Sequence, residues 1–272
     1  MTIKAPNSRR NLDLAIQREF GEDYIKVRTI MANAIVAQML PNGAVKGGSA
    51  IKFRFGNVGT RFSDDLDTVQ GKGLTGFINS LELELKKGWN GFTGHVVSRP
   101  PAKPKGVPVQ YIMQPFEVKL SYNNKPWLTV MLEVGHNEIG DADEPDWGIS
   151  PDISAIFKQL GFPAPNPAPL MPLRHQIAQK LHGASEPNSR RAHDLIDLQC
   201  ILANETIDYG ALKTTCQRLF AYRKMQVWPP TIVKGDDWDN LYAAQTEGLS
   251  VAKSIDDAVI WANDLIVQIN SA

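Results

Sequence analysis

The chain of 272 residues lacks the features that would assign it to a specialised class. Its only cysteines, Cys200 and Cys216, lie in helix-like segments, and they provide neither a disulfide framework nor metal-site spacing. No apolar run approaches the ~20 residues that a membrane-spanning helix needs. The first residues, MTIKAPNSRRNLDL, lack the apolar core of a secretory signal. We therefore expect a cytoplasmic protein that does not enter a membrane.

Neither sign of charge dominates, because 29 Lys and Arg residues balance 29 Asp and Glu residues. That balance excludes the overall basic field of a protein that coats nucleic acid. Apolar residues make up 43% of the chain and charged residues 21%, as in ordinary globular proteins. The length fits one large domain or two modest ones.

The pattern of apolar residues changes along the chain. Residues 10–40 repeat apolar side chains at three- and four-residue spacing, which predicts helical structure, and residues 74–88 predict a further helix that ends at Gly88. Alternating patterns predict three strands, at residues 92–98, 108–122 and 128–135.

Five prolines between residues 162 and 173 predict an extended connector, after which the chain is helical nearly to its end. The expected fold class is α+β. A mixed-sheet domain with N-terminal helices spans residues 1–160, and an α-helical domain spans residues 161–272.

The strongest candidate site begins with a glycine turn and continues into an acidic strand. Gly47, Gly48 and Ser49 offer N–H groups and a hydroxyl to phosphate oxygens. Asp65 and Asp67 follow at i and i+2, which is one face of a strand. Carboxylates held so close repel one another and favour a hard cation such as Mg²⁺ or Mn²⁺, which binds carboxylates together with substrate phosphates.

A third carboxylate would complete such a metal site. Glu133 lies in an otherwise apolar strand, where an acidic side chain is costly unless it is paired or binds a metal. Glu117 lies in a similar strand and is the competing candidate, and either residue could instead face solvent.

A second candidate cluster lies in the helical half of the chain. Lys180 falls on one predicted helix, while Asp194 and Asp197 share a face of the next at i and i+3. A lysine there could neutralise a triphosphate, and a carboxylate could act as a general base or position the lysine. By spacing alone, an ordinary pair of amphipathic helices with surface charges explains the pattern better than a functional site does.

Together these motifs resemble the AbiEii-like nucleotidyltransferases. The family comprises the toxins of type IV abortive-infection toxin–antitoxin systems, within the DNA polymerase β-type nucleotidyltransferase superfamily. The resemblance covers residues 40–203, and its elements occur in order: Gly-Gly-Ser at residue 47, Arg-x-Ser-x-Asp-Leu-Asp at residue 61, an acidic strand, and the Lys and Asp motifs of the helical half.

The resemblance implies transfer of a nucleotide from an NTP, with pyrophosphate released. It implies nucleotide binding by Gly47, Gly48, Ser49, Ser63 and Lys180, metal binding by Asp65 and Asp67, and catalytic roles for Asp65, Asp67, Lys180 and Asp194. Glu133 is added to the metal ligands on the strand argument above. In the family an arginine directly precedes the aspartate, whereas here Ala192 and His193 separate Arg191 from Asp194. Asp197 is therefore an alternative to Asp194, and Arg61 is a weaker candidate.

The family also implies an RNA acceptor, tRNA above all, and a cognate antitoxin protein. Basic residues in the helical half fit an RNA backbone, among them Lys213, Arg218, Arg223 and Lys224, and Lys103 and Lys105 add to them. Two alternatives stay open: an antibiotic-type nucleotidyltransferase that modifies a small molecule, and a catalytically inactive module that binds a nucleotide or a partner.

Overall fold

The computed structural model describes residues 3–71, 73–102 and 112–272. These residues form two compact units, and the chain passes between the units several times. Unit 1 comprises Met1–Asn57, Phe62–Asn137 and Ala142–Leu170, and unit 2 comprises Val58–Arg61, Glu138–Asp141 and Met171–Ala272.

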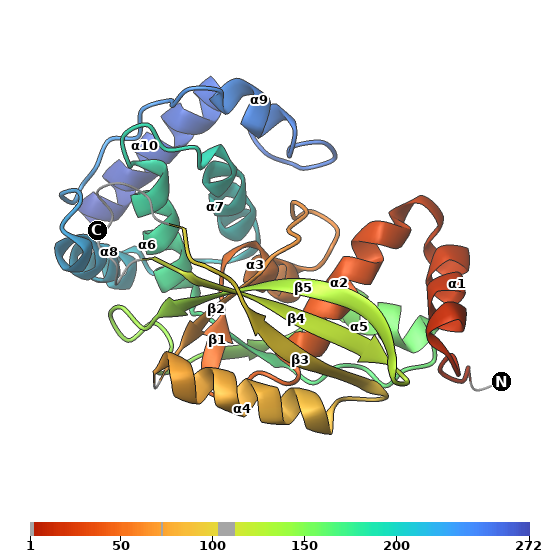
Figure 1. Ribbon diagram of the computed structural model, residues 1–272. Coiled ribbons are helices and arrows are strands. Elements are labelled where there is room, and N and C mark those ends of the chain that lie inside the picture. The colour runs from red at the N-terminus through yellow and green to blue at the C-terminus, as the bar shows by residue number, and fades with distance from the viewer. Residues whose placement is uncertain (1–2, 72, 103–111) are drawn as a thin grey trace. The chain divides into compact units, whose positions relative to one another are not determined.

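A seven-stranded sheet is the centre of unit 1 (Figure 1), with the spatial order β3-β4-β5-β2-β1-β7-β6. The sheet is mixed, since β2 is parallel to β5 and β1 to β7, whereas the other neighbouring strands are antiparallel. The strands are β1 (Gly43–Val45), β2 (Leu66–Gln70), β3 (Phe92–Ser98), β4 (Gln114–Tyr122), β5 (Lys125–His136), β6 (Asp146–Gly148) and β7 (Ala168–Leu170).

The two faces of the central strands differ in polarity. In β5, Val130, Leu132 and Val134 are buried, while Met131 and Glu133 between them are at least partly exposed. This alternation is typical of a strand with one face on the core. The second face of β5 is therefore able to carry polar side chains.

The helices of unit 1 bury apolar surface against this sheet and against each other. They are α1 (Arg9–Phe20), α2 (Tyr24–Ala37), α3 (Gly47–Phe55), α4 (Leu74–Lys87) and α5 (Pro151–Gln159). Helix α4 runs along the sheet beside β3 and buries Phe77, Leu81 and Leu85, which recur at four-residue spacing (Figure 1). Helix α2 packs against β5, β7 and α5, and every residue from 30 to 37 is buried.

Unit 2 is helical in its described part. Its helices are α6 (Leu173–Ala184), α7 (Ala192–Asn204), α8 (Tyr209–Arg223), α9 (Trp238–Ala243) and α10 (Ile255–Ser271). Helix α6 contacts both α7 and α8, and α10 packs against α7, α8 and α9. The fully buried Trp238 of α9 donates its indole N–H to the carbonyl of Ser189, which ties α9 to the turn between α6 and α7.

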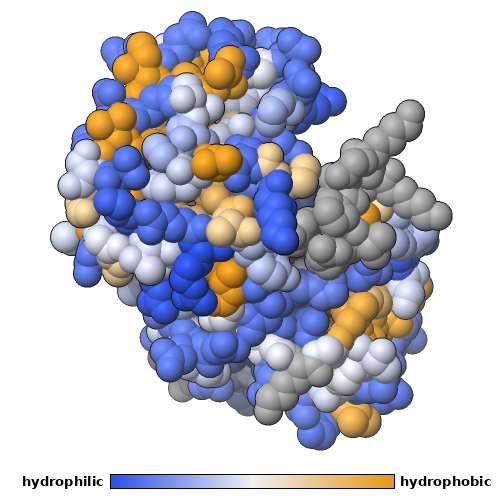
Figure 2. Space-filling model, turned by 90° about the vertical axis from the view of Figure 1, so that its left-hand side faces the viewer, coloured by the Kyte–Doolittle hydropathy of each residue, from blue (hydrophilic) through white to orange (hydrophobic). Residues whose placement is uncertain are grey.

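No helix in the described ranges is both long and apolar enough to cross a membrane. On the face of the molecule in Figure 2, hydrophobic residues form separate small patches in a mainly hydrophilic surface. Patches of this kind are normal on folded proteins.

The predicted α+β class is confirmed, and the predicted helix at residues 74–88 corresponds to α4. The predicted strands correspond to β3, β4 and β5, although residues 108–111 lie outside the described residues. The chain enters unit 2 for the last time at Met171, inside the Pro-rich segment that was predicted to connect two domains.

The predicted helical structure of residues 10–40 is confirmed as two helices, α1 and α2, with a 3-10 turn at Gly21–Asp23 between them. Two local predictions were wrong. The Gly47-Gly48-Ser49 segment is the first turn of α3, since the buried Ala50, Ile51 and Phe53 that follow it supply a helical apolar face. The Pro-rich segment is not only a connector, since its residues 168–170 form β7 within the sheet.

Candidate functional site

The carboxylate of Asp67 lies against the start of α3. Gly47 begins this helix with a φ of 64°, a left-handed conformation that glycine adopts without strain. A Cβ at Gly47 would overlap the Oδ2 atom of Asp67. Glycine is therefore required at this position both by the backbone conformation and by the space that Asp67 occupies.

Ser49, in the same turn, is bonded inside the protein. Its hydroxyl donates to the carbonyl of Asp65 at 2.6 Å and accepts from the amide of Asn33 at 3.4 Å, and its side chain is buried. These bonds hold the segment that leads into β2. The predicted contact of Ser49 with phosphate stays a prediction, as does that of Ser63, which is partly exposed.

Asn33 is a residue that the sequence interpretation missed. Its amide lies within 3.5 Å of the backbone carbonyls of Asp64 and Asp65, besides its contact with Ser49. Asn33 was absorbed into the helical pattern of α2. The available signal was that it is the one polar residue in the apolar run from residue 30 to residue 37.

Glu133 lies directly opposite Asp67. The two residues are paired in the parallel register of β2 and β5, so their side chains share one face of the sheet. Asp65 precedes β2 by one residue and is exposed. The structure therefore brings Asp67 and Glu133 together across two strands, with Asp65 just before the first of them.

Glu117, the competing candidate, is paired with cations instead. On β4 it lies opposite Met131 rather than Glu133, and it forms ion pairs with Arg99 and Lys119. The hydrogen bond from Lys119, then that from Arg99, lowers the pKa of the Glu117 carboxyl. Glu133 is thus the better placed of the two glutamates to join Asp67.

The carboxylates of unit 1 suit a cation such as Mg²⁺, whose coordination shell is completed by phosphate oxygens of a substrate and by water. In the described part of the chain, no three His, Cys, Asp or Glu side chains already form a group that could hold a metal ion. Mg²⁺ needs fewer protein ligands than that, since it is held by one or two carboxylates together with substrate phosphates and water. Asp67 and Glu133, with Asp65 beside them, carry hard oxygen atoms of the kind that such an ion binds.

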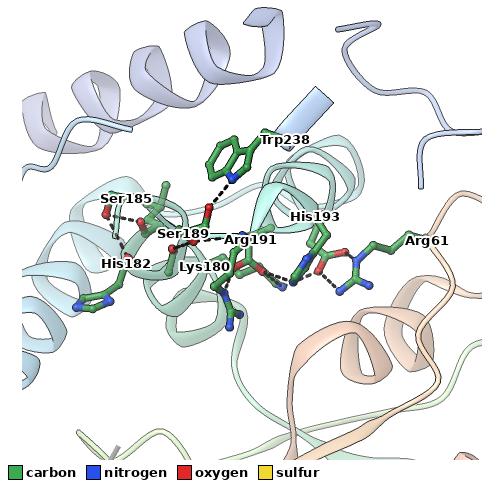
Figure 3. A network of polar contacts seen from close by, with 12 residues as sticks. Arg61, Lys180, His182, Ser185, Ser189, Arg191, His193 and Trp238 are labelled. Carbon is green, nitrogen blue, oxygen red and sulfur yellow. Dashed lines mark hydrogen bonds and ion pairs between the residues drawn. The ribbon is translucent and has the colours of Figure 1, made fainter. Parts of the chain in front are cut away.

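In unit 2, Lys180 is at the centre of a buried ion-pair network (Figure 3). Its ammonium lies 3.0 Å from Oδ1 of Asp194 and 2.6 Å from Oδ2 of Asp197, and its side chain is only 5% exposed. Because Asp194 and Asp197 are one turn apart on α7, both carboxylates reach the same lysine. The sequence left open whether Asp194 or Asp197 is the functional aspartate. In the structure both of them bind Lys180, so this contact does not distinguish between them.

Two arginines complete the network from outside helix α7. Arg61 binds Asp197 with both arms of its guanidinium, Nε to Oδ1 at 2.8 Å and Nη2 to Oδ2 at 3.0 Å. Arg191 binds Oδ2 of Asp194 at 2.6 Å. The arginine that precedes the Ser-x-Asp-Leu-Asp motif thus belongs to this network in unit 2, a contact that no local sequence spacing reveals.

The network keeps both aspartates ionised. Burial alone would raise the pKa of Asp194, but the charges of Arg191 and Lys180 hold that pKa well below its usual range. The pKa of Asp197 is likewise lowered by Lys180 and Arg61 against the effect of burial. Burial lowers the pKa of the neighbouring His193 to about 4, despite the opposing charge of Asp194.

The network therefore carries a surplus positive charge near neutral pH. In the ion pairs that the structure describes for this network, three cations, Lys180, Arg61 and Arg191, bind two carboxylates, and the neighbouring His193 is neutral near pH 7. Arg191 is half exposed, whereas the other four charged side chains are nearly buried. Such a cluster can attract an anion.

The predicted site residues thus fall into two groups. Gly47, Gly48, Ser49, Asp65, Asp67 and Glu133 belong to unit 1, as does Ser63, while Arg61, Lys180, Asp194 and Asp197 belong to unit 2. The predicted basic residues Lys103 and Lys105 lie outside the described residues.

Comparison with protein families matches residues 29–261 to the family described as nucleotidyl transferase AbiEii toxin, type IV TA system. Among solved structures, the chain is similar to MenT4, a nucleotidyltransferase toxin from Mycobacterium tuberculosis H37Rv, at 17% identity and a TM-score of 0.54 over 95% of this chain and 98% of that one. JHP933 from Helicobacter pylori matches at 14% identity and a TM-score of 0.44 over 92% and 93% of the two chains. No curated protein matches the chain.

Proposed function

The chain belongs to the AbiEii nucleotidyltransferase toxin family of type IV toxin–antitoxin systems, as its motifs predicted, and we propose that it transfers a nucleotide from an NTP to an RNA acceptor, tRNA above all, in a reaction that needs Mg²⁺. The observation that carries the proposal is the pairing of Asp67 with Glu133 on one face of the sheet, beside the start of α3.

In this proposal Asp65, Asp67 and Glu133 would hold the cation. Bound there, Mg²⁺ would supply Lewis-acid stabilisation of the charge on the phosphates. The chain's own contribution is to fix the carboxylates. Gly47 leaves the space that the Asp67 side chain occupies, and Ser49 and Asn33 hold the backbone at Asp65.

For unit 2, we propose that the lysine network binds phosphate. The surplus positive charge of the network supports this role, and the two aspartates orient the Lys180 ammonium. A preorganised cation of this kind stabilises the charge that develops in the transition state more than it stabilises the ground state. Asp194 remains a candidate to act on the acceptor hydroxyl.

An RNA acceptor is supported by the surface of α8. Arg218 and Tyr222 are both exposed and are four residues apart, so they lie next to each other on the helix, and the exposed Lys224 follows at its end. A cation beside an aromatic ring can contact an RNA phosphate and stack on a base. Arg218 also donates to the carbonyl of Ile139 at 2.9 Å, and Arg223 of the same segment forms an ion pair with Glu138.

The proposal can be tested by incubating the purified protein with each α-³²P-labelled NTP, Mg²⁺ and total RNA, followed by a denaturing gel. Label in a band of tRNA size, lost on addition of EDTA, is the expected result. A matched reaction would replace the RNA with a hydroxylated small molecule such as an aminoglycoside.

Each other outcome contradicts a different part of the proposal. Label in the small molecule but not in RNA would favour an antibiotic-type nucleotidyltransferase. Binding of an NTP without turnover on either acceptor would favour an inactive module. Transfer that persists in EDTA would contradict the need for a cation at the carboxylates.

A further inference from the structure

Lys46 is a cation beside the carboxylates of unit 1 to which the motifs assign no role. It connects β1 to α3 and immediately precedes Gly47. Its backbone N–H donates to the carbonyl of Asp67 at 2.9 Å, and its side chain is half-buried. This hydrogen bond holds the backbone of Lys46 next to Asp67, the residue that faces Glu133.

The position of Gly135 locates the ammonium of Lys46. A Cβ built on Gly135 would lie 2.9 Å from Nζ of Lys46 and 3.5 Å from its Cε atom. The end of the lysine side chain therefore lies against the backbone of β5, in space that any other residue at position 135 would take.

The ammonium lies on the same sheet face as the two carboxylates. Gly135 is opposite Val69, one same-face pair beyond Glu133 and Asp67 in the parallel register of β5 and β2. Alternate residues of a strand are about 7 Å apart along one face. Lys46 thus places a positive charge roughly one residue pair from Asp67 and Glu133.

A phosphate chain brought to two carboxylates meets like charge, and a neighbouring cation offsets that repulsion. An ammonium donates charge-assisted hydrogen bonds to phosphate oxygens, and the flexible lysine stem lets it follow them. We propose that Lys46 binds a phosphate oxygen of the NTP next to Asp67 and Glu133, and that Gly135 supplies the room for it. This inference rests on the proposed nucleotidyl transfer.

Two kinds of variant separate the effect of the Lys46 charge from the effect of the space that Gly135 leaves for it. Lys46→Met removes the cation, and Lys46→Arg retains it. Gly135→Ala keeps the lysine but displaces its ammonium. The backbone of Gly135 is outside the left-handed region, and the nearest atom is the flexible end of a side chain, so the alanine variant is expected to fold. Lys119→Met is the matched control, because it removes a partly exposed lysine from β4.

The decisive measurement is calorimetric titration of a non-hydrolysable α,β-methylene NTP analogue with Mg²⁺, alongside titration of Mn²⁺ alone. We expect Lys46→Met and Gly135→Ala to weaken analogue binding by about tenfold or more, Lys46→Arg to bind more tightly than Lys46→Met, and Lys119→Met to match the wild type. Mn²⁺ alone should bind Lys46→Met at least as tightly as it binds the wild type, because a repelling cation is gone. Thermal melting confirms that each variant is folded.

Two results would overturn the inference in distinguishable ways. If the wild type binds the analogue and Lys46→Met binds it equally well, Lys46 only balances the carboxylates, and nucleotidyl transfer is unaffected. If the wild type binds no analogue with any of the four bases, the proposed function fails and the role of Lys46 fails with it.

Discussion

The side chain of Asp67 has close neighbours on two elements of unit 1. Its carboxylate fills the space that Gly47 leaves, and Glu133 faces it from the neighbouring strand. Two carboxylates on one face repel each other in the absence of a cation. Asp67 therefore lies between a like charge on β5 and the nearby cation of Lys46, which offsets part of that repulsion.

We expect Asp67→Asn to lower nucleotide transfer by on the order of a hundredfold or more, since it weakens the ligand set for the cation. Its melting temperature in metal-free buffer should equal or exceed that of the wild type, because the repulsion with Glu133 is removed. Transfer assays and thermal melts check both parts. Asp64→Asn is the control, since Asp64 is exposed and three positions away; equal activity of the two variants would contradict the role of Asp67.

Lys180→Met should lower transfer far more than Arg190→Met, although each substitution removes one positive charge. Lys180 binds two buried aspartates, whereas Arg190 is 76% exposed and lies 3.7 Å from Asp237. Loss of Lys180 should lower the rate by about a hundredfold or more at saturating RNA, and saturating RNA should restore Arg190→Met.

Stability measurements complete the Lys180 comparison. Removing one partner of a buried ion pair leaves the other charge uncompensated and costs about 3–5 kcal/mol. Denaturant melts should therefore find Lys180→Met less stable than the wild type and Arg190→Met nearly unchanged. Restoration of Lys180→Met to the wild-type rate by added RNA would make Lys180 an RNA contact or a structural residue.

At the scale of elements, sequence patterns identified α4 and the long strands because their apolar periodicity extends over many residues. They failed at Gly47, where glycines suggested a turn although the next residues form a helix. The three-residue strands β1, β6 and β7 are too short for a pattern, and they exist because neighbouring strands supply their hydrogen bonds. The pairing of Asp67 with Glu133 depends on a register set by distant segments, so the sequence identified both residues but not their contact.

The packing of α6 on α8 provides a prediction on pH. The ring of His182 on α6 packs against that of Phe220 at a tilt of 60°, and its Nδ1 lies 3.3 Å from Nη1 of Arg223, which is itself bound to Glu138. Burial, followed by the charges of Arg223 and Arg191, lowers the pKa of His182 to about 3. Its neutral form is therefore favoured in the folded state.

Because the folded pKa is below the ordinary value of about 6.5, the contribution of His182 is fully present above pH ~6.5 and is lost as the pH falls toward 3. We expect the melting temperature to fall between pH 7 and pH 4.5, and to fall less in His182→Gln. Parallel melts across this range give the comparison. Identical pH dependence of the two proteins would show that His182 is accessible to protons when folded.

For the whole molecule, membership of a toxin family predicts that expression without a partner slows bacterial growth. The effect should disappear in Asp67→Asn and persist in Asp64→Asn, because it depends on nucleotide transfer rather than on protein load. Growth curves after induction, with equal protein levels verified by immunoblot, provide the measurement. Equal inhibition of growth by both variants would show that the toxicity does not depend on nucleotide transfer.

The path of the chain between the units has a consequence for how the protein is made. Arg61 precedes its partner Asp197 by 136 positions. At about 5–20 residues per second, a ribosome needs on the order of ten seconds to add the intervening segment. Throughout that interval the guanidinium of Arg61 has no carboxylate of α7 to bind. A nascent chain released before residue 197 cannot contain the buried network, so the network is confined to chains that extend at least to Asp197.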